Sequence, residues 1–393
     1  MKRIPLERPD IEITRKSKRY RRPLIPNDRK DYFLILILVF YIFFCPKYDD
    51  RNIRTSYECF FVLLSDYNSV EIENLDDMGK INTLNYSKCS ICTFIAKNYA
   101  SNSGPEDVIL TIMMKSYTNL VACVKSLRTT GSKATFFVFT DSETLSSVPQ
   151  QVIDLANHCG CIFVNIGVFP SLSNKEFWGF RYLLYDKFLV SHYIFINRVL
   201  IIDLFDTIFQ GDPFSKNTRD DKVYFSSEFQ KIIKCYINYD WIKVLAPNNY
   251  SEYGEKTIIN GGSLIGGALP IIRLLRVFFS MFDYKNLSSM LVDDQGYMNY
   301  ILYSNILETH RINYAIDESG EIIVSLNKVL VWQRIPNDYT VGNFVMKDGF
   351  RHPPVVHQYK FDIACRESII KHCYEPAFNM DLFLPNVDNY YLV

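Results

Sequence analysis

Two carboxylates that follow an apolar run are the residues of this sequence best placed to do chemistry. In VLIIDLFDTIFQGDPF (199–214), Asp203 and Asp206 come directly after four apolar residues. Such a run is typical of a strand buried on both faces of a parallel sheet, and ligands bind where such strands end. Two acids there repel each other unless a cation neutralises them. Because Mg²⁺ and Mn²⁺ prefer oxygen ligands, the stretch predicts a metal–diphosphate site, with a pair of capping acids as the alternative.

Two other motifs contain groups that could complete such a site. Asn260, Gly261 and Gly262 belong to a glycine-rich stretch, predicted to be a turn, where the missing Cβ lets backbone approach a ligand. The alternative is a plain loop. Asp293 and Asp294 begin a predicted helix, where one of them could take a proton from an acceptor hydroxyl. Helix capping explains these acids equally well.

A histidine near the end of the chain is the third candidate. His357 follows two valines in VVHQYK, 355–360. Imidazole is a common metal ligand, so His357 could join a site formed by the two acids. A structural histidine is the alternative.

The elements before the acidic strand predict how these residues are positioned. Strands at 108–114, 134–140 and 161–166 alternate with helices at 119–128 and 149–159. This order predicts a βαβαβ unit with a parallel sheet, which commonly binds nucleotides at the strand ends. Asp141, directly after the second strand, is therefore a candidate nucleotide-binding residue. No Gly-x-Gly-x-x-Gly opens the first helix, which argues against a dinucleotide cofactor, and no Gly-Lys-Ser/Thr loop is present, which excludes a P-loop NTPase.

Fewer elements are predicted beyond that unit. A helix at 177–191 precedes the acidic strand, and a polar excursion extends to about residue 256. A helix at 269–282 and strand-like runs at 322–326 and 329–332 follow.

The N-terminus combines a basic tail with an apolar segment. Residues 1–31 contain eleven Lys/Arg against five acids, and YFLILILVFYIFFC (32–45) follows without a charge. Fourteen helical residues span about 21 Å, which is short for a membrane helix. Since no small-residue cleavage site follows, we expect an uncleaved signal anchor with the tail in the cytoplasm. A buried core helix and a cleaved signal are the alternatives.

The cysteine content indicates the compartment, and the net charge limits which partners are expected. Ten cysteines and three N-glycosylation sequons fit the lumen of the secretory pathway. The spacing does not give disulfide connectivity, and Cys89-x-x-Cys92 alone is weak evidence for zinc or redox chemistry. A net charge of +0 gives no reason to expect nucleic acid as a partner.

Taken together, the order of these motifs over 108–376 resembles the GT-A-fold, metal-dependent glycosyltransferases that use nucleotide-diphosphate sugars. The resemblance implies an α/β fold with a GT-A-like mixed, mostly parallel sheet flanked by helices, preceded by a single N-terminal transmembrane helix. It also implies Mn²⁺ or Mg²⁺, a nucleotide-diphosphate sugar donor and a glycan or glycoconjugate acceptor. The family's Asp-x-Asp is here Asp203-x-x-Asp206, which leaves open which acid binds the metal directly.

The resemblance assigns a role to each candidate residue. Asp203, Asp206 and His357 would hold the metal; Asn260, Gly261 and Gly262 would line the donor sugar; Arg181 would offset phosphate charge; Asp293 or Asp294 would face the acceptor.

The resulting layout is a type II protein of the Golgi or endoplasmic reticulum membrane, with its catalytic domain in the lumen. Its expected parts are a tail (1–31), an anchor (32–46), a stem or accessory region (47–105), a catalytic domain (106–378) and a C-terminal tail (379–393). Two other functions remain open. One is a haloacid-dehalogenase-type phosphatase with Asp203 as nucleophile, and the other is a non-catalytic lumenal sugar-binding protein.

Overall fold

The computed structural model describes residues 86–96, 102–168, 174–215, 217–282, 292–326, 352–361 and 363–374. The expected tail, anchor and C-terminal tail, and most of the expected stem, lie outside these ranges. Their boundaries therefore remain predictions. Within the described ranges, no helix combines the length and apolar character needed to cross a membrane.

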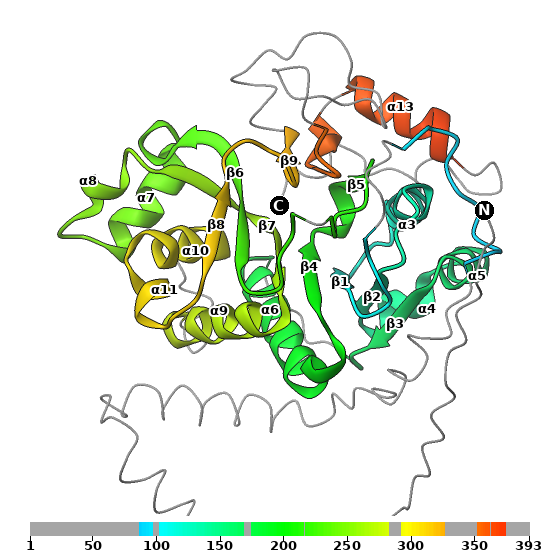
Figure 1. The fold of residues 1–393 in the computed structure, drawn as a ribbon, viewed down its shortest axis with the longest axis horizontal. Coiled ribbons are helices and arrows are strands. Elements are labelled where there is room, and N and C mark those ends of the chain that lie inside the picture. The colour runs from blue at the N-terminus through cyan, green and yellow to red at the C-terminus, as the bar shows by residue number, and fades with distance from the viewer. Residues whose placement is uncertain are drawn as a thin grey trace, which may run out of the picture. The chain divides into compact units, whose positions relative to one another are not determined.

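Seven of the described strands form one mixed sheet, in the order β3-β2-β1-β4-β7-β6-β8 (Figure 1). β1 pairs in parallel with both β2 and β4, and β2 pairs in parallel with β3. β7 runs antiparallel to its neighbours β4 and β6, and β6 pairs in parallel with β8. The strands are β1 (Val108–Met113), β2 (Thr135–Thr140), β3 (Cys161–Asn165), β4 (Arg198–Ile202), β6 (Val223–Lys231), β7 (Thr257–Gly267) and β8 (Tyr314–Asp317). The predicted mixed α/β fold with a mostly parallel sheet is confirmed.

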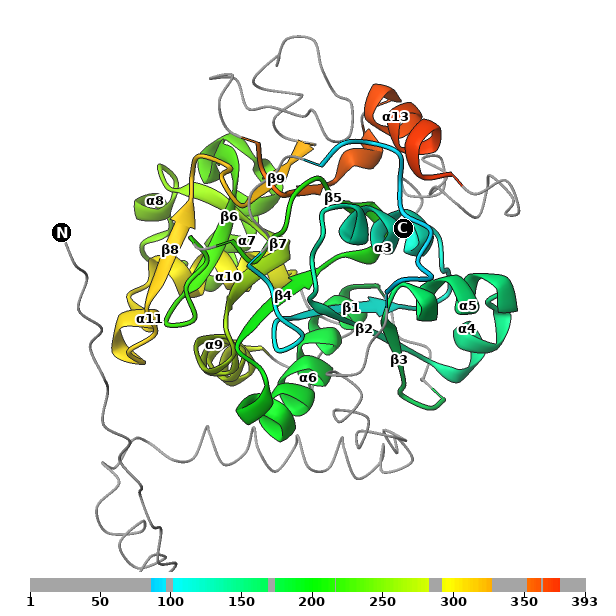
Figure 2. The same ribbon diagram turned by 45° about the vertical axis from the view of Figure 1, so that its right-hand side comes forward.

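Helices cover both faces of this sheet (Figures 1 and 2). Alternate residues of β1 belong to two separate cores: Ile109 packs with α3 and α5, whereas Leu110 packs with α6, α9 and α10. This alternation follows from the two-residue period of a strand. The helices are α3 (Leu120–Thr129), α4 (Ser142–Ser147), α5 (Gln150–His158), α6 (Asn174–His192), α9 (Ala268–Met281), α10 (Asp294–Tyr303) and α11 (Ile306–Thr309).

The glycine-rich stretch is a buried strand, β7, so the predicted turn is wrong. None of its glycines has a positive φ. A Cβ on Gly266 would lie 2.5 Å from the Lys222 carbonyl oxygen, and one on Gly267 would lie 1.6 Å from that of Asp220. Glycine here permits the close approach of neighbouring backbone rather than a change of direction.

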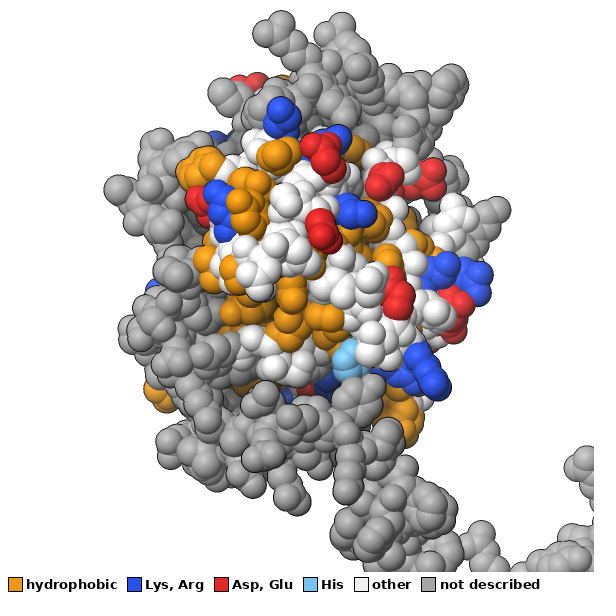
Figure 3. Space-filling model, turned by 90° about the vertical axis from the view of Figure 1, so that its left-hand side faces the viewer, with side chains coloured by type: hydrophobic (Ala, Val, Ile, Leu, Met, Phe, Trp, Pro, Cys, Tyr) orange, Lys and Arg blue, Asp and Glu red, His pale blue; other side chains and the backbone are white. Residues whose placement is uncertain are grey.

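The predicted polar excursion contains regular structure that the sequence analysis missed. Besides β6, it includes η4 (Ile232–Lys234), α7 (Tyr236–Leu245) and α8 (Tyr250–Tyr253). These short elements lack a purely apolar buried face, since α7 buries Asn238 beside Ile242. Large apolar side chains are exposed here instead, namely Ile233, Tyr236, Ile237 and Val244. Figure 3 shows the face on this side, where apolar side chains lie between charged ones.

A second, three-stranded sheet joins distant parts of the chain. β10 (Val355–His357) pairs antiparallel with β5 (Thr207–Phe209) and in parallel with β9 (Ile323–Ser325). The short helix η6 (Tyr359–Phe361) and then α13 (Ile363–Cys373) follow β10. The run predicted at 329–332 lies outside the described residues.

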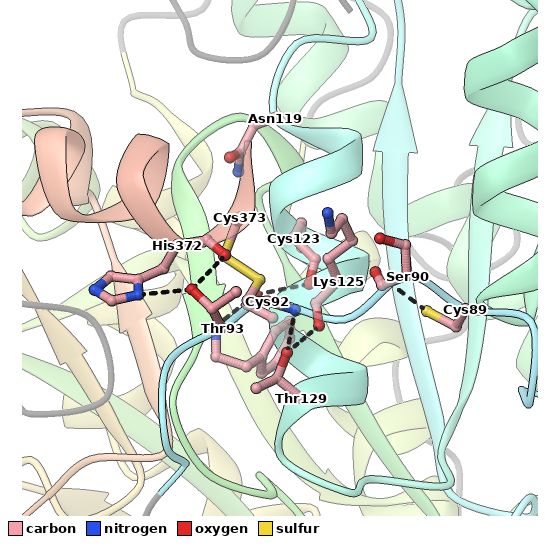
Figure 4. Close-up of a disulfide and its surroundings, with 12 residues drawn as sticks. Cys89, Ser90, Cys92, Thr93, Asn119, Cys123, Lys125, Thr129, His372 and Cys373 are labelled. Carbon is pink, nitrogen blue, oxygen red and sulfur yellow. Dashed lines mark hydrogen bonds between the residues drawn. A yellow bond between two sulfur atoms is a disulfide. The ribbon is translucent and has the colours of Figure 1, made fainter. Parts of the chain in front are cut away.

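Two disulfides attach residues 86–96 to the domain. Cys89 is bonded to Cys159 and Cys92 to Cys373. Figure 4 shows the second bridge, which lies between α3 and α13. Beside it, the Thr93 backbone N–H donates to the His372 carbonyl oxygen (2.9 Å). Each cysteine of the Cys-x-x-Cys motif thus bonds a distant partner, which accounts for the motif without zinc or redox chemistry.

The pairing generates a prediction about covalent structure and stability. Peptide mapping without reduction should recover the Cys89–Cys159 and Cys92–Cys373 peptides. Replacing Cys92 and Cys373 together by alanine should lower the free energy of unfolding by about 2–5 kcal/mol, because the bridge constrains the unfolded chain. Urea denaturation measures this, and Cys235→Ala, which breaks no disulfide, is the control. A peptide linking Cys89 directly to Cys92 would contradict the pairing.

Candidate functional site

Asp203, Asp206 and His357 converge at the carboxyl end of β4. Asp203 follows β4 directly, Asp206 ends the short helix η3 (Leu204–Asp206), and His357 ends β10. One ligand atom of each lies within 4.8 Å of the other two. His357 Nε2 is 3.2 Å from Asp206 Oδ1 and 3.6 Å from Asp203 Oδ2. The three predicted metal ligands are therefore close together, although the sequence separates His357 widely from the acids.

Strand register explains how His357 reaches the acids. In the β5–β10 ladder His357 pairs with Thr207, the residue after Asp206. Gln358 then adopts a left-handed conformation (φ 57) that ends the strand. This turn brings Lys360 Nζ to 2.9 Å from Asp206 Oδ2. Lys360 was missed by the sequence analysis; its spacing from His357, His-x-x-Lys, is the pattern that could have indicated it.

The outer oxygens of both acids are paired with basic side chains. Arg181 forms an ion pair with Asp203 Oδ1, and Lys360 pairs with Asp206 Oδ2. These contacts turn the other two oxygens, Asp203 Oδ2 and Asp206 Oδ1, towards His357 Nε2. The arrangement is one in which a cation could bind both acids and the imidazole at once.

Unsatisfied polar atoms at the centre of this cluster fit a cation. Asp206 Oδ1 and both ring nitrogens of His357 are buried and make no hydrogen bond of good geometry to the described part of the chain. Buried polar atoms rarely lack a partner, so each such atom needs an explanation. Two carboxylates and an imidazole suit a divalent cation such as Mn²⁺.

The pKa values of the three groups reflect their mutual attraction. Burial raises the pKa of Asp206, but the charges of His357 and Lys360 outweigh it and hold the pKa well below its usual range. Burial also raises the pKa of Asp203, and Arg181 is the main group that lowers it below normal. Burial lowers the pKa of His357, yet the two carboxylates raise it to about 9. Without a cation, His357 therefore carries a proton at neutral pH.

This protonation makes metal binding depend on pH. A cation must displace the His357 proton, so Mn²⁺ affinity should rise about tenfold per pH unit between about 7 and 9 and then level off. Calorimetry in buffers of different ionisation enthalpy should find about one proton released per Mn²⁺.

The stability of the metal-free chain should change in the opposite direction. Stabilisation by the charged imidazole is complete below the ordinary pKa of 6.5 and is lost as pH rises through about 9. His357→Gln should remove both effects, whereas His310→Gln, at an exposed histidine, should leave them unchanged. A Mn²⁺ affinity independent of pH would contradict the assignment of His357.

Gly262 leaves the space in which Asp203 and His357 meet. A Cβ at this position would lie 2.2 Å from Asp203 Oδ2 and 2.8 Å from His357 Cε1. The Asp203 backbone N–H also donates to the Gly262 carbonyl oxygen (2.9 Å), which fixes the two residues side by side. The glycine is therefore required for the geometry of the cluster.

Gly262→Ala should consequently disrupt the site while the sheet persists. The added methyl group must displace Asp203 or His357, so Mn²⁺ affinity should fall at least tenfold in an equilibrium titration. Gly254→Ala is the matched control, since the nearest atom to its Cβ would lie at 3.3 Å. Equal Mn²⁺ affinity in the two variants would show that the cluster does not bind the cation.

Arg181 connects the candidate metal site to α10. Its guanidinium is buried, and Nη2 lies 2.8 Å from Asp294 Oδ2 and 3.1 Å from the Gly261 carbonyl oxygen. Tyr182 donates its hydroxyl to the same carbonyl oxygen at 2.5 Å. Because Asp203, Asp294 and the Gly261 carbonyl oxygen pair with its two Nη atoms, Arg181 acts on the site through them. Its predicted role in offsetting phosphate charge stays a prediction.

The predicted helix start at Asp293 and Asp294 is confirmed, and the two acids differ in their surroundings. Asp293 is the N-cap of α10, and its Oδ1 accepts a hydrogen bond from the Asp294 backbone N–H (2.8 Å). Asp294 is buried beside Arg181. Burial raises the pKa of Asp294 to about 7, against the opposing charge of Arg181. Asp294 is thus the acid that Arg181 links to the metal cluster, and its role towards an acceptor stays a prediction.

The remaining candidates make contacts within the protein. Asn260 Oδ1 accepts from the Gly262 backbone N–H (2.8 Å), and Asn260 Nδ2 donates to Glu228 Oε1 (3.0 Å). The Gly261 N–H donates to Gln295 Oε1 (3.0 Å). The bonds to Glu228 and Gln295 hold β7 against β6 and α10, whereas the bond between Asn260 and Gly262 lies within β7. Contact of Asn260, Gly261 and Gly262 with a donor sugar stays a prediction.

Asp141 lies apart from the cluster. It caps α4 by accepting from the Thr144 backbone N–H (2.8 Å) and hydroxyl (2.7 Å). It follows β2, which β1 separates from β4 in the sheet. Its role in binding a nucleotide stays a prediction, and capping explains its burial.

Comparison with known proteins gives little further information. No protein-family model and no curated protein matches the sequence. Among solved structures, the fold is similar to that of mouse xyloside xylosyltransferase 1 in its apo form, with a TM-score of 0.39 and 10% sequence identity. The match covers 64% of this chain and 96% of that chain. A likeness this weak supports no assignment, which must come from the site itself.

Proposed function

We propose that this chain is a metal-dependent glycosyltransferase that moves a sugar from a nucleotide-diphosphate donor to a glycan, glycoprotein or glycolipid acceptor in the secretory pathway. The convergence of Asp203, Asp206 and His357 at the carboxyl edge of a mostly parallel sheet is the main support. A divalent cation held by these residues, when bound, would neutralise the charge that develops on a leaving nucleotide diphosphate.

The charges around the cluster favour the binding of a cation first and of an anionic donor after it. Among the described residues, three carboxylates (Asp203, Asp206 and Asp294) surround two basic side chains (Arg181 and Lys360). Without a cation His357 is protonated, and these charges then balance. A divalent cation that replaces the proton leaves the site with a net positive charge, which attracts a diphosphate. This supports a donor that binds after, or together with, its metal.

The phosphatase alternative is less well supported by the order of the elements. The domain places three parallel strands before β4, the strand that leads to Asp203, whereas the phosphatase motif normally opens its domain. Asp203 Oδ1 is paired with Arg181, and Oδ2 faces the position that a cation would take beside His357.

The proposed compartment, the lumen of the secretory pathway, rests on the disulfides and the N-terminal sequence. Two disulfides indicate folding in an oxidising environment. Together with the basic tail and the apolar segment at 32–45, they support a lumenal domain behind a type II anchor.

Asp206→Asn is the variant that tests the proposed function. It removes one ligand charge without changing volume, so transfer from a nucleotide sugar should fall at least a hundredfold, a cost of about 3–4 kcal/mol in transition-state free energy. The free energy of unfolding should drop by about 1–3 kcal/mol at neutral pH, because Lys360 and His357 lose a charged partner. A screen of nucleotide sugars with Mn²⁺, read as donor hydrolysis or transfer, provides the assay.

An exposed acid serves as the control. Asp221→Asn, in a surface ion pair with Arg219, should leave transfer unchanged. Metal-dependent transfer that survives Asp206→Asn would place the active site elsewhere. Phosphomonoester turnover that disappears in Asp203→Asn would instead establish the phosphatase, and sugar binding without transfer would establish a non-catalytic protein.

A further inference from the structure

Asn119 is a fully buried side chain that contacts both segments bearing the candidate metal ligands. It precedes α3 in a left-handed conformation (φ 69), which asparagine tolerates better than most residues, and it does not cap its own helix. Instead, Nδ2 donates to the carbonyl oxygens of Leu204 (2.6 Å) and Thr207 (3.0 Å). Oδ1 accepts a hydrogen bond from the Tyr359 hydroxyl.

These partners lie close in sequence to a ligand in each segment. Leu204 and Thr207 lie on either side of Asp206, and Tyr359 is the second residue after His357. One amide group thus ties the backbone of η3 to the side chain that follows β10. The other backbone connection between these segments is the β5–β10 ladder of three residue pairs, extended by hydrogen bonds from Gln210 and Gly211 to the Pro354 carbonyl oxygen. The Lys360–Asp206 ion pair joins them through side chains. A strand pair that short does not fix a geometry firmly by itself.

The helix that follows Asn119, α3, is held in place at its C-terminal end. Thr129, the last residue of α3, accepts a hydrogen bond from the Cys92 backbone N–H (2.8 Å). Cys92 is in turn bonded to Cys373 at the end of α13 (Figure 4). Asn119 therefore projects from an anchored helix towards the two segments.

We propose that Asn119 is a positioning residue that sets the separation between the Asp206 carboxylate and the His357 imidazole, and thereby the affinity of the site for a divalent cation. Its side chain hydrogen-bonds to neither ligand side chain. The inference rests on the proposed function only in requiring that the cluster binds a cation.

The test compares two glycine variants in the purified full chain. Asn119→Gly keeps the left-handed backbone accessible and removes the amide. Asn305→Gly is the matched control, since Asn305 also precedes a helix with positive φ (59) and makes no capping hydrogen bond. Binding of Mn²⁺ alone is titrated by electron paramagnetic resonance, and thermal unfolding is followed without metal. We expect the dissociation constant to rise at least tenfold for Asn119→Gly and less than twofold for Asn305→Gly.

A second variant keeps the proposal testable should Asn119→Gly fail to fold. Tyr359→Phe removes only the hydroxyl bonded to Asn119 and should raise the Mn²⁺ dissociation constant about three- to tenfold. Since the two residues share one hydrogen bond, the double variant should bind Mn²⁺ more tightly than the product of the single effects implies.

The outcomes separate this inference from the proposed function. Lower unfolding temperatures with unchanged Mn²⁺ affinity in Asn119→Gly, or in Tyr359→Phe where only that variant folds, would show a purely structural role and overturn the inference alone. A wild-type chain that binds no Mn²⁺ would overturn the proposed function and the inference with it.

Discussion

Two carboxylates held close together at a buried strand end are the constraint on which the rest of the site depends. Asp203 and Asp206 would repel each other there, and burial by itself would favour their protonation. The chain instead keeps both ionised by pairing one oxygen of each with a base, Arg181 or Lys360. The inner oxygens remain facing His357. The structure thus supplies counter-charge on the outside of the site, and its centre is neutralised by the His357 proton or by a cation that replaces it.

Each of these neutralising groups comes from a different part of the chain. Arg181 is on α6, between the third and fourth parallel strands, and Lys360 is on η6. Burying Arg181 is favourable only because Asp203, Asp294 and a carbonyl oxygen accept its hydrogen bonds. An unpaired guanidinium at that depth would be strongly destabilising. Formation of the site is therefore coupled to the packing of α6 and α10 against the sheet.

The sequence allowed the parallel half of the fold to be predicted because its determinants are local. The apolar run 199–202 and the alternation of strands and helices from residue 108 follow from periodicity, and the structure agrees within about two residues at most ends. β7 was mistaken for a turn because a run of glycines is compatible with two structures. Glycine is favoured both where a turn requires a positive φ and where neighbouring backbone packs closely against a strand. Only the position of Lys222 and Asp220 against the strand distinguishes them.

The residues that complete the site could not be predicted in this way, since their partners are distant in sequence. Lys360 and Asn119 acquire their contacts only once β10 pairs with β5 and α3 lies beside η3. The disulfide partners of Cys89 and Cys92 likewise could not be predicted from the spacing of the cysteines. His357 was identified as a candidate because imidazole suits a metal, but its placement depends on a register of three residue pairs.

The charges around the cluster bear on whether it is a functional site or one that has lost its function. A cluster kept only for stability would gain by losing charge, because replacing buried ionic groups with apolar ones of similar volume is often neutral or stabilising. Here two acids, a histidine, a lysine and an arginine are retained around atoms that bond to nothing else described, beside a glycine whose replacement they exclude. A purely structural role for these charges does not account for the unsatisfied inner atoms, Asp206 Oδ1 and the ring nitrogens of His357, whereas a cation at the centre would satisfy them.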